Sequence, residues 1–322
     1  MSIRLAMVLE SSVSNSTLTL NESSNKDCWR LDHCGQHHMH RNLAVPVFVN
    51  CVLNAPLSIT AIIGNMLVIY SMWNSSTLLR SPSNFLLFGL AVCDLGVGVT
   101  VQPFYIIYQS FYLTYHLQAW LATMKVHNVI SNLFCGVSFL TTTAVSIDRY
   151  LALHLHLRYR KLVTMRRTFR LLGSLWIIAV LTASTLLWKP NITFFAALFV
   201  IATCIFITIG VYVKIFTIVR FHRKKILKQL GQEKYTVLQQ TKSALNMFYV
   251  CLIHTFCYIP YFVFLILRDG YKTTDFTVLG TEFAQTLIFL NSSLNPILYC
   301  WRLRDIRIAV KRTTAKIRCN KF

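Results

Sequence analysis

Ser138–Tyr150 reads SFLTTTAVSIDRY and ends an apolar segment that begins near Ala119. This segment, residues 119–152, is long enough for a bilayer-crossing helix, which needs about 20 mostly apolar residues. An acid and a base at positions 148 and 149 are costly where such a helix leaves the membrane, unless they pair or face protein. The stretch therefore predicts a membrane span with paired charges at its end, although ordinary flanking charge explains Asp148-Arg149-Tyr150 equally well on its own.

Six further apolar runs accompany this segment. Only 13% of the 322 residues are charged and 55% are hydrophobic, whereas about 25% of the residues in soluble domains are charged. Each run is long enough to span a bilayer as a tilted helix. We therefore predict an all-α fold, a seven-transmembrane helix bundle over residues 44–300. The seven runs lie at about 44–73, 83–110, 119–152, 169–188, 193–221, 243–267 and 276–300.

Lysine and arginine concentrate on one side of the predicted bundle. If the N-terminus lies outside, the three inner loops and the tail hold 1, 7, 8 and 8 of these residues, 24 of the 32 in the chain. Cytoplasmic loops carry such an excess, so the pattern predicts an outer N-terminus and a cytoplasmic C-terminus. The formal net charge of +21 thus reflects membrane topology, and no nucleic-acid partner is expected.

The first 43 residues are polar and rich in serine, asparagine and threonine. We expect residues 1–43 to form a disordered extracellular segment. Asn15 and Asn21 each begin an acceptor triplet for N-glycosylation, which agrees with an outside location. Cys28 and Cys34 lie in the same segment and are candidates for a local disulfide.

The other end of the chain has an amphipathic pattern. In residues 301–322, the apolar Leu303, Ile306 and Val310 alternate with arginines and lysines. This pattern predicts a helix that lies on the inner membrane surface, attracted by anionic lipid, and a short cytoplasmic tail after it. Membrane lipid is therefore an expected partner.

Asp94 is a carboxylate deep inside an apolar run. An acid in lipid is expensive and by default functional. One interpretation is a sodium site, because oxygen ligands with one carboxylate suit a small hard cation. The other is a carboxyl group that only holds helices together, and both interpretations remain open. Apart from sodium, we predict no metal and no cofactor. The candidate partners of the carboxylate are Asn65, Ser138, Asn291, Ser292 and Asn295.

Prolines and short motifs follow the order of the spans. Pro103, Pro260 and Pro296 each remove a helix hydrogen bond and are candidate hinges. The motif residues are Gly64-Asn65, Leu90 to Asp94, Asp148-Arg149-Tyr150, Trp176, Tyr212, Cys257 to Pro260 and Asn295 to Tyr299. Together, over about residues 44–317, the chain resembles the class A, rhodopsin-like G-protein-coupled receptors. The adenosine, melanocortin, cannabinoid and lysophospholipid receptors are the most similar groups.

The resemblance implies a plasma-membrane receptor that binds an extracellular ligand and activates a heterotrimeric G protein, with arrestin as a further partner and no enzymatic activity. It implies that Arg149 engages the G protein after release from Asp148. The implied activation residues are Asp148, Arg149, Tyr150, Tyr212 and Tyr299; the sodium residues are Asp94, Ser138, Asn291 and Asn295; the switch residues are Tyr258, Pro260, Asn295 and Pro296.

The ligand of the named receptors is not carried over. Leu265 and Phe289 stand where adenosine receptors bind the purine, and Ser131 stands where amine receptors have an aspartate. A neutral, lipidic or small peptide ligand is expected, because no cluster of acids lines the predicted pocket. The candidate ligand residues are His127, Asn128, Ser131, Asn132, Cys135, Tyr258, Tyr261, Glu282 and Gln285.

Two departures from the family pattern affect the expected behaviour. Met124 occupies the position of the usual disulfide cysteine, and the second outer loop, about Trp188 to Ile192, has no cysteine. Gln240 replaces the acid that often pairs with the arginine, so we expect high basal signalling. A membrane transporter is the alternative function, but transporters usually show internal repeats and broken helices, and neither is evident here.

Overall fold

The computed structural model describes residues 43–155, 158–188, 190–226, 252–267 and 274–319. In these ranges the regular secondary structure is helical, which confirms the all-α prediction. The predicted glycosylation sites Asn15 and Asn21, the predicted disulfide of Cys28 with Cys34, and Gln240 lie outside the described residues.

The spanning helices follow the predicted apolar runs in order. Five stretches of the described chain are long and apolar enough to cross a membrane. They are α3 (Ala44–Trp73), the stretch Pro82–Leu113, α7 (Leu117–Leu155), α9 (Met165–Trp188) and Phe195–Ile218 within α10 (Pro190–Ile226). The sixth run appears as the helix over Leu252–Leu267 and the seventh as α12 (Asp275–Arg302).

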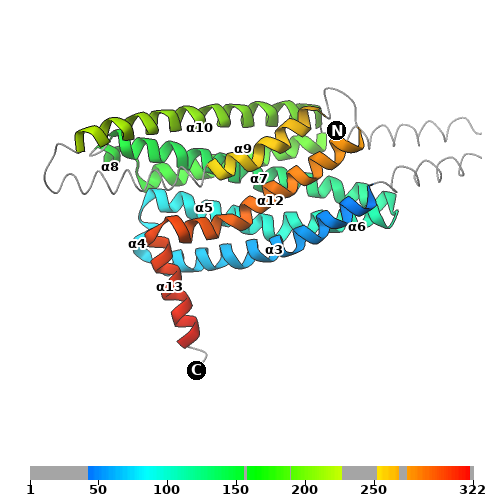
Figure 1. The fold of residues 1–322 in the computed structure, drawn as a ribbon, viewed down its shortest axis with the longest axis horizontal. Coiled ribbons are helices and arrows are strands. Elements are labelled where there is room, and N and C mark those ends of the chain that lie inside the picture. The colour runs from blue at the N-terminus through cyan, green and yellow to red at the C-terminus, as the bar shows by residue number, and fades with distance from the viewer. Residues whose placement is uncertain (1–42, 156–157, 189, 227–251, 268–273, 320–322) are drawn as a thin grey trace, which may run out of the picture.

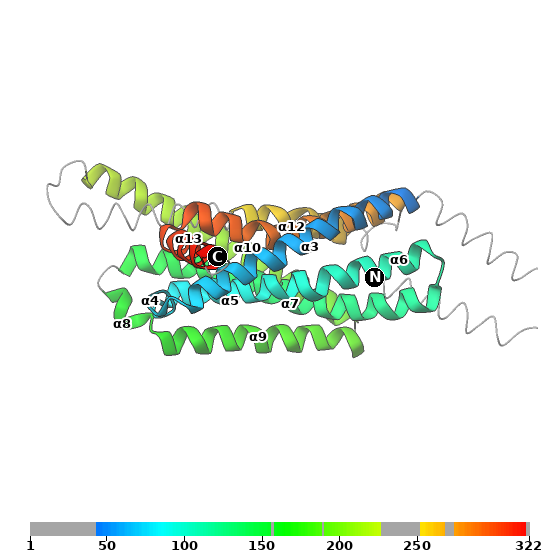
Figure 2. The ribbon, with the colours of Figure 1, turned by 90° about the horizontal axis from the view of Figure 1, so that it is seen from below.

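Figures 1 and 2 show that these helices run side by side along the longest axis, as a bundle. Two short helices, α4 (Ser76–Leu79) and α8 (Tyr159–Leu162), lie at one end of it, which we call the inner end. The helix α13 (Arg304–Cys319) leaves the same end and runs across the bundle direction (Figure 1). Its Ile306 and Ala309 are buried against the bundle, while Arg307 is exposed, so the amphipathic pattern forms the expected helix.

The second span is not one regular helix. It consists of α5 (Pro82–Gly96), a π-helical turn over Val97–Val101 and α6 (Gln102–Leu113). Pro103 is near the start of α6 and has no N–H to donate to the preceding turn, and the Gln102 N–H bonds to the Val97 carbonyl five residues back. The predicted irregularity at Pro103 is therefore present as a widened turn, whereas Pro296 lies inside the continuous helix α12.

A close contact between α3 and α12 brings the first and last spans together. A Cβ atom added at Gly64 would lie 2.9 Å from Cγ of Pro296, so only glycine permits this approach. The neighbouring Asn65 amide donates to the Ser292 carbonyl at 3.0 Å. These contacts place the polar residues of α12 against the second and third spans.

Candidate functional site

Asp148 lies at the inner end of α7 and its carboxylate is 5% exposed. Arg149 donates to Oδ2 through Nη2, and also through Nε at 3.0 Å. Ser83 Oγ donates to Oδ2 and the Tyr159 hydroxyl to Oδ1, each at 2.6 Å. The predicted pairing of Asp148 with Arg149 is therefore present, and the carboxylate also ties α7 to α5 and α8. We call Asp148, Arg149, Ser83 and Tyr159 the inner lock.

Tyr159 remains a hydrogen-bond donor in this lock. Burial, together with the charge of the neighbouring Asp148 carboxylate, raises the pKa of the Tyr159 hydroxyl to about 12. The hydroxyl is thus protonated at physiological pH and satisfies a carboxylate oxygen that would otherwise be left to Arg149. Neither Ser83 nor Tyr159 could be recognised from the sequence, because serine and tyrosine are ordinary residues at the ends of spans.

The other predicted activation residues belong to two hydrophobic clusters. Tyr212 on α10 is buried, and its hydroxyl lies 3.1 Å from Ser146 Oγ, one turn of α7 before Arg149. Tyr150 packs, partly buried, against the small cluster that contains Tyr212. Tyr299 on α12 is fully buried in the inner hydrophobic core with Leu298.

Asp94 is fully buried between α5, α7 and α12. Ser138 and Ser292 donate to its Oδ1 at 3.3 and 2.8 Å, and Asn295 donates to its Oδ2 at 2.6 Å. The predicted contacts with Ser138 and Asn295 are thus found. We call Asp94, Ser138, Ser292 and Asn295 the inner carboxylate cluster.

Asn291, predicted for the same site, points elsewhere. Its amide donates to Nδ1 of His254 at 2.6 Å, on the helix Leu252–Leu267. Ser292 and Asn295 are three residues apart and both face Asp94, whereas Asn291 lies one turn before Asn295 and its amide is used by His254. The hydrogen-bonded partners of Asp94 among the described residues therefore do not include Asn291.

Several buried amide oxygens near this cluster accept no hydrogen bond from the described residues. They are Oδ1 of Asn65, Oδ1 of Asn291 and Oδ1 of Asn295. Buried acceptors without a donor are unusual and need an explanation. One carboxylate with hydroxyl and amide oxygens is a donor set that suits a small hard cation, so the residues present fit sodium.

The outer half of the bundle holds a partly buried carboxylate, that of Glu282. Oε2 of Glu282 on α12 accepts hydrogen bonds from the Tyr105 hydroxyl at 2.9 Å, the Tyr108 hydroxyl at 3.1 Å and Gln109 Nε2 at 2.7 Å. Asn50 on α3 donates to the same Tyr105 hydroxyl at 2.6 Å. We call these five residues the outer carboxylate cluster. In the sequence, the cluster was indicated only by polar residues within apolar runs.

His127 lies beside the outer carboxylate cluster and is fully buried. Its Nε2 is 2.8 Å from Gln285 Nε2, and its Nδ1 is 3.2 Å from the Val101 carbonyl. Because an amide nitrogen can only donate, Nε2 accepts and Nδ1 carries the proton. His127 is thus a satisfied structural partner of Gln285.

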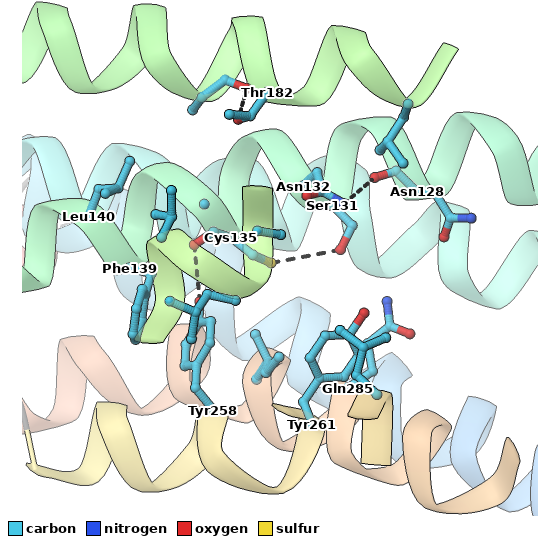
Figure 3. A pocket seen from close by; sticks show the side chains of 18 of the residues that line it. Asn128, Ser131, Asn132, Cys135, Phe139, Leu140, Thr182, Tyr258, Tyr261 and Gln285 are labelled. Atoms are coloured by element: carbon cyan, nitrogen blue, oxygen red, sulfur yellow. Dashed lines mark hydrogen bonds between the residues drawn. The ribbon is translucent and has the colours of Figure 1, made fainter. Parts of the chain in front are cut away.

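A cavity of about 190 Å³ opens between α7, α9, α10, the helix Leu252–Leu267 and α12. Figure 3 shows residues from these helices pointing toward it. His127 and Glu282 do not line it; they belong to the neighbouring polar contacts. The predicted ligand residues that do line it are Asn128, Ser131, Asn132, Cys135, Tyr258, Tyr261 and Gln285.

Tyr258 connects the cavity to the centre of the bundle. Its hydroxyl donates to the Cys135 carbonyl of α7 at 3.1 Å, as the dashed line in Figure 3 shows. Its ring packs against Phe139, with centroids 4.6 Å apart, and against His254 at 4.8 Å. Pro260, the other predicted switch residue of this span, lies two residues further along the same helix and does not line the cavity.

Comparisons with known proteins agree with this arrangement. The model of the 7 transmembrane receptor (rhodopsin family) matches residues 64–191 and 183–299. The adenosine receptor A2b of Gallus gallus is 26% identical over 313 residues, which cover 83% of this chain and 88% of that protein. The melanocortin receptor 3 of Homo sapiens is 27% identical, with 81% and 84% covered, and the histamine H2 receptor of Rattus norvegicus is 27% identical, with 84% and 80% covered.

These relatives are receptors, and nothing among them supports the transporter alternative. The helical bundle, the paired Asp148 and Arg149 and the outer cavity agree with what the family match implies. The chain therefore belongs to the rhodopsin family of seven-transmembrane receptors, which bind extracellular ligands, signal through G proteins and are not enzymes.

Proposed function

We propose that the inner lock holds this receptor in its inactive form and that release of Arg149 from Asp148 lets the guanidinium contact a heterotrimeric G protein. The observation that carries this proposal is the set of donors on Asp148. Arg149, Ser83 and Tyr159 all bond to one carboxylate that is 5% exposed. A charge-assisted pair of this kind, partly shielded from water, is stronger than an exposed one.

The lock faces the cytoplasm of a plasma-membrane receptor whose N-terminus is extracellular. The inner end carries exposed cations on α8 and α13, among them Arg160, Lys161 and Arg307, which supports this orientation. The same surface would receive the G protein and arrestin. The basic face of α13 would bind anionic lipid of the inner leaflet.

A ligand in the outer cavity acts by shifting an existing equilibrium toward the released form, which requires that it bind the two forms with different affinity. Tyr258 is suited to transmit ligand binding to α7, because it lines the cavity and its hydroxyl bonds to the α7 backbone at Cys135. Sodium in the inner carboxylate cluster would neutralise Asp94 and be held by Ser138, Ser292 and the free amide oxygens.

The test measures nucleotide exchange on a purified G protein with the receptor in lipid nanodiscs and no added ligand. Asp148→Asn weakens the hold on Arg149 and should raise exchange about fivefold to tenfold, which corresponds to about 1–1.4 kcal/mol. Arg149→Ala should abolish receptor-dependent exchange. Ser83→Ala removes only one neutral donor and should give an intermediate increase. Unchanged exchange in Arg149→Ala would overturn the proposal.

A further inference from the structure

The outer cavity is built without charge. Among the described residues that line it there is no aspartate, glutamate, lysine, arginine or histidine. Its amide side chains and a serine hydroxyl lie on α7 and α12, at Asn128, Ser131, Asn132 and Gln285. The Asn132 amide donates to the Asn128 carbonyl at 3.3 Å. Such groups suit hydroxyl or amide groups of a ligand and do not neutralise an ion.

Apart from the hydroxyl groups of Thr182, Tyr258 and Tyr261, the remaining wall of the cavity is apolar, and it reaches the seam between α9 and α10. Ile178, Thr182 and Leu186 line it from one face of α9, because they are spaced four residues apart. Ala197, Val200 and Ile201 line it from α10. The cavity thus extends away from the bundle axis, toward helices that face the bilayer.

Ile178 marks the place where the cavity wall meets the lipid-facing surface. It lines the cavity and is also 43% exposed. Its neighbours Ile177 and Leu181 are 62% and 61% exposed on the same spanning helix, where lipid chains surround the protein. A ligand that lies against Ile178 can therefore continue from the cavity into the bilayer.

The size of the cavity favours such a ligand. Pockets that enclose a drug-sized molecule measure about 300–1,000 Å³, and this one encloses about 190 Å³. A longer molecule fits only if part of it lies outside, and the seam offers an apolar path. We infer that the receptor takes an uncharged amphiphile from the bilayer through the seam between α9 and α10, with its polar head at Asn128, Ser131 and Asn132. This inference rests on the proposed function and adds the ligand class and its route.

Gly136 offers a direct way to close the cavity. It lines the cavity on α7, and a Cβ atom added there would meet no other atom within 4 Å. Gly136→Leu therefore fills the space without a backbone clash. Gly210→Leu on α10 is a matched control, because its Cβ also meets nothing within 4 Å and Gly210 does not line the cavity. Ala197→Phe, at the seam, is a second blocking variant.

The experiment uses the full chain in nanodiscs with a monoacylglycerol that carries a photoreactive diazirine in its acyl chain. The wild type and Gly210→Leu should be labelled saturably on α7, α9 and α10. Gly136→Leu or Ala197→Phe should be labelled about tenfold less, a change of about 1.4 kcal/mol in binding. Size-exclusion profiles and melting curves show which blocking variant is folded, and only a folded variant is compared.

Two outcomes overturn the inference. Equal labelling of the wild type and a folded blocking variant would mean that the probe reports only surrounding lipid. Stronger saturable labelling by a probe with the same chain and a phosphate head would show that the ligand is charged. The same nanodiscs separate this inference from the proposed function: if exchange still depends on Arg149 while saturable labelling is absent, only the ligand inference fails.

Discussion

Asp94 and Glu282, the acids of the inner and the outer carboxylate cluster, are satisfied in different ways. Glu282 accepts hydrogen bonds from one face of α6, at Tyr105, Tyr108 and Gln109, so its carboxylate faces several donors. Asp94 accepts hydrogen bonds from residues of α7 and α12. The nearby amide oxygens of Asn65, Asn291 and Asn295 accept no hydrogen bond from the described residues. The outer carboxylate cluster thus joins helices, whereas the inner one has spare acceptors that a cation can use.

The position of the outer carboxylate cluster in the bundle is a reason for the number of hydrogen-bond donors around Glu282. Met124 is buried in the outer core at the position where the family resemblance implies a disulfide cysteine. Bonds from α6 to α12 hold the outer ends together across chain separations of 174 and 177 residues. The same kind of substitution is therefore expected to have different effects in the inner and the outer half of the bundle.

The largest expected effect is in the outer half. Glu282→Ala removes the acceptor of three donors and leaves them buried, at a cost of about 3–5 kcal/mol. The melting temperature of the purified receptor should fall strongly, or its surface expression should be lost. Glu282→Gln keeps an acceptor oxygen and is the matched control, with a loss of about 1 kcal/mol. Equal losses in the two variants would show that the donors do not depend on Glu282.

A smaller, ion-dependent effect is expected at the inner carboxylate cluster. Replacing potassium with sodium should raise the free energy of unfolding of the wild type by about 1 kcal/mol, because an ion that binds only the folded form stabilises it by mass action. Asp94→Asn should remove this response. Glu282→Gln should retain it, which distinguishes the two carboxylates. A wild type that melts identically in both salts would end the sodium hypothesis.

The smallest effect is expected for a residue outside the described part of the chain. Gln240 stands where the family resemblance implies an acid, and Gln240→Glu would add a charge partner for Arg149 worth about 0.2–1 kcal/mol. Ligand-free exchange should fall severalfold at most, and Gln240→Ala should leave it unchanged. Negligible exchange in both the wild type and Gln240→Glu would refute the expected high basal signalling.

Hydropathy along the chain was enough to predict the order of the spans and the amphipathic α13, since both are properties of single segments. The contacts of Asp94 with Ser138 and Asn295 were expected from the polar residues on neighbouring spans and from the family resemblance. Neither source indicated that Asn291 turns to His254, or that Tyr108 and Gln109 bond to Glu282. Those contacts depend on how each helix is rotated about its own axis, and single-segment patterns carry little information on rotation.

The amino-acid sequence by itself determined that this protein crosses a membrane, which segments do so and which end is basic, because burial in lipid selects apolar residues one segment at a time. Only the tertiary structure decided that Ser83 joins Asp148 across 65 residues and that the cavity reaches the seam between α9 and α10. The physical reason is that lipid makes every span apolar, whereas the sites arise where a few polar or small side chains on different spans meet.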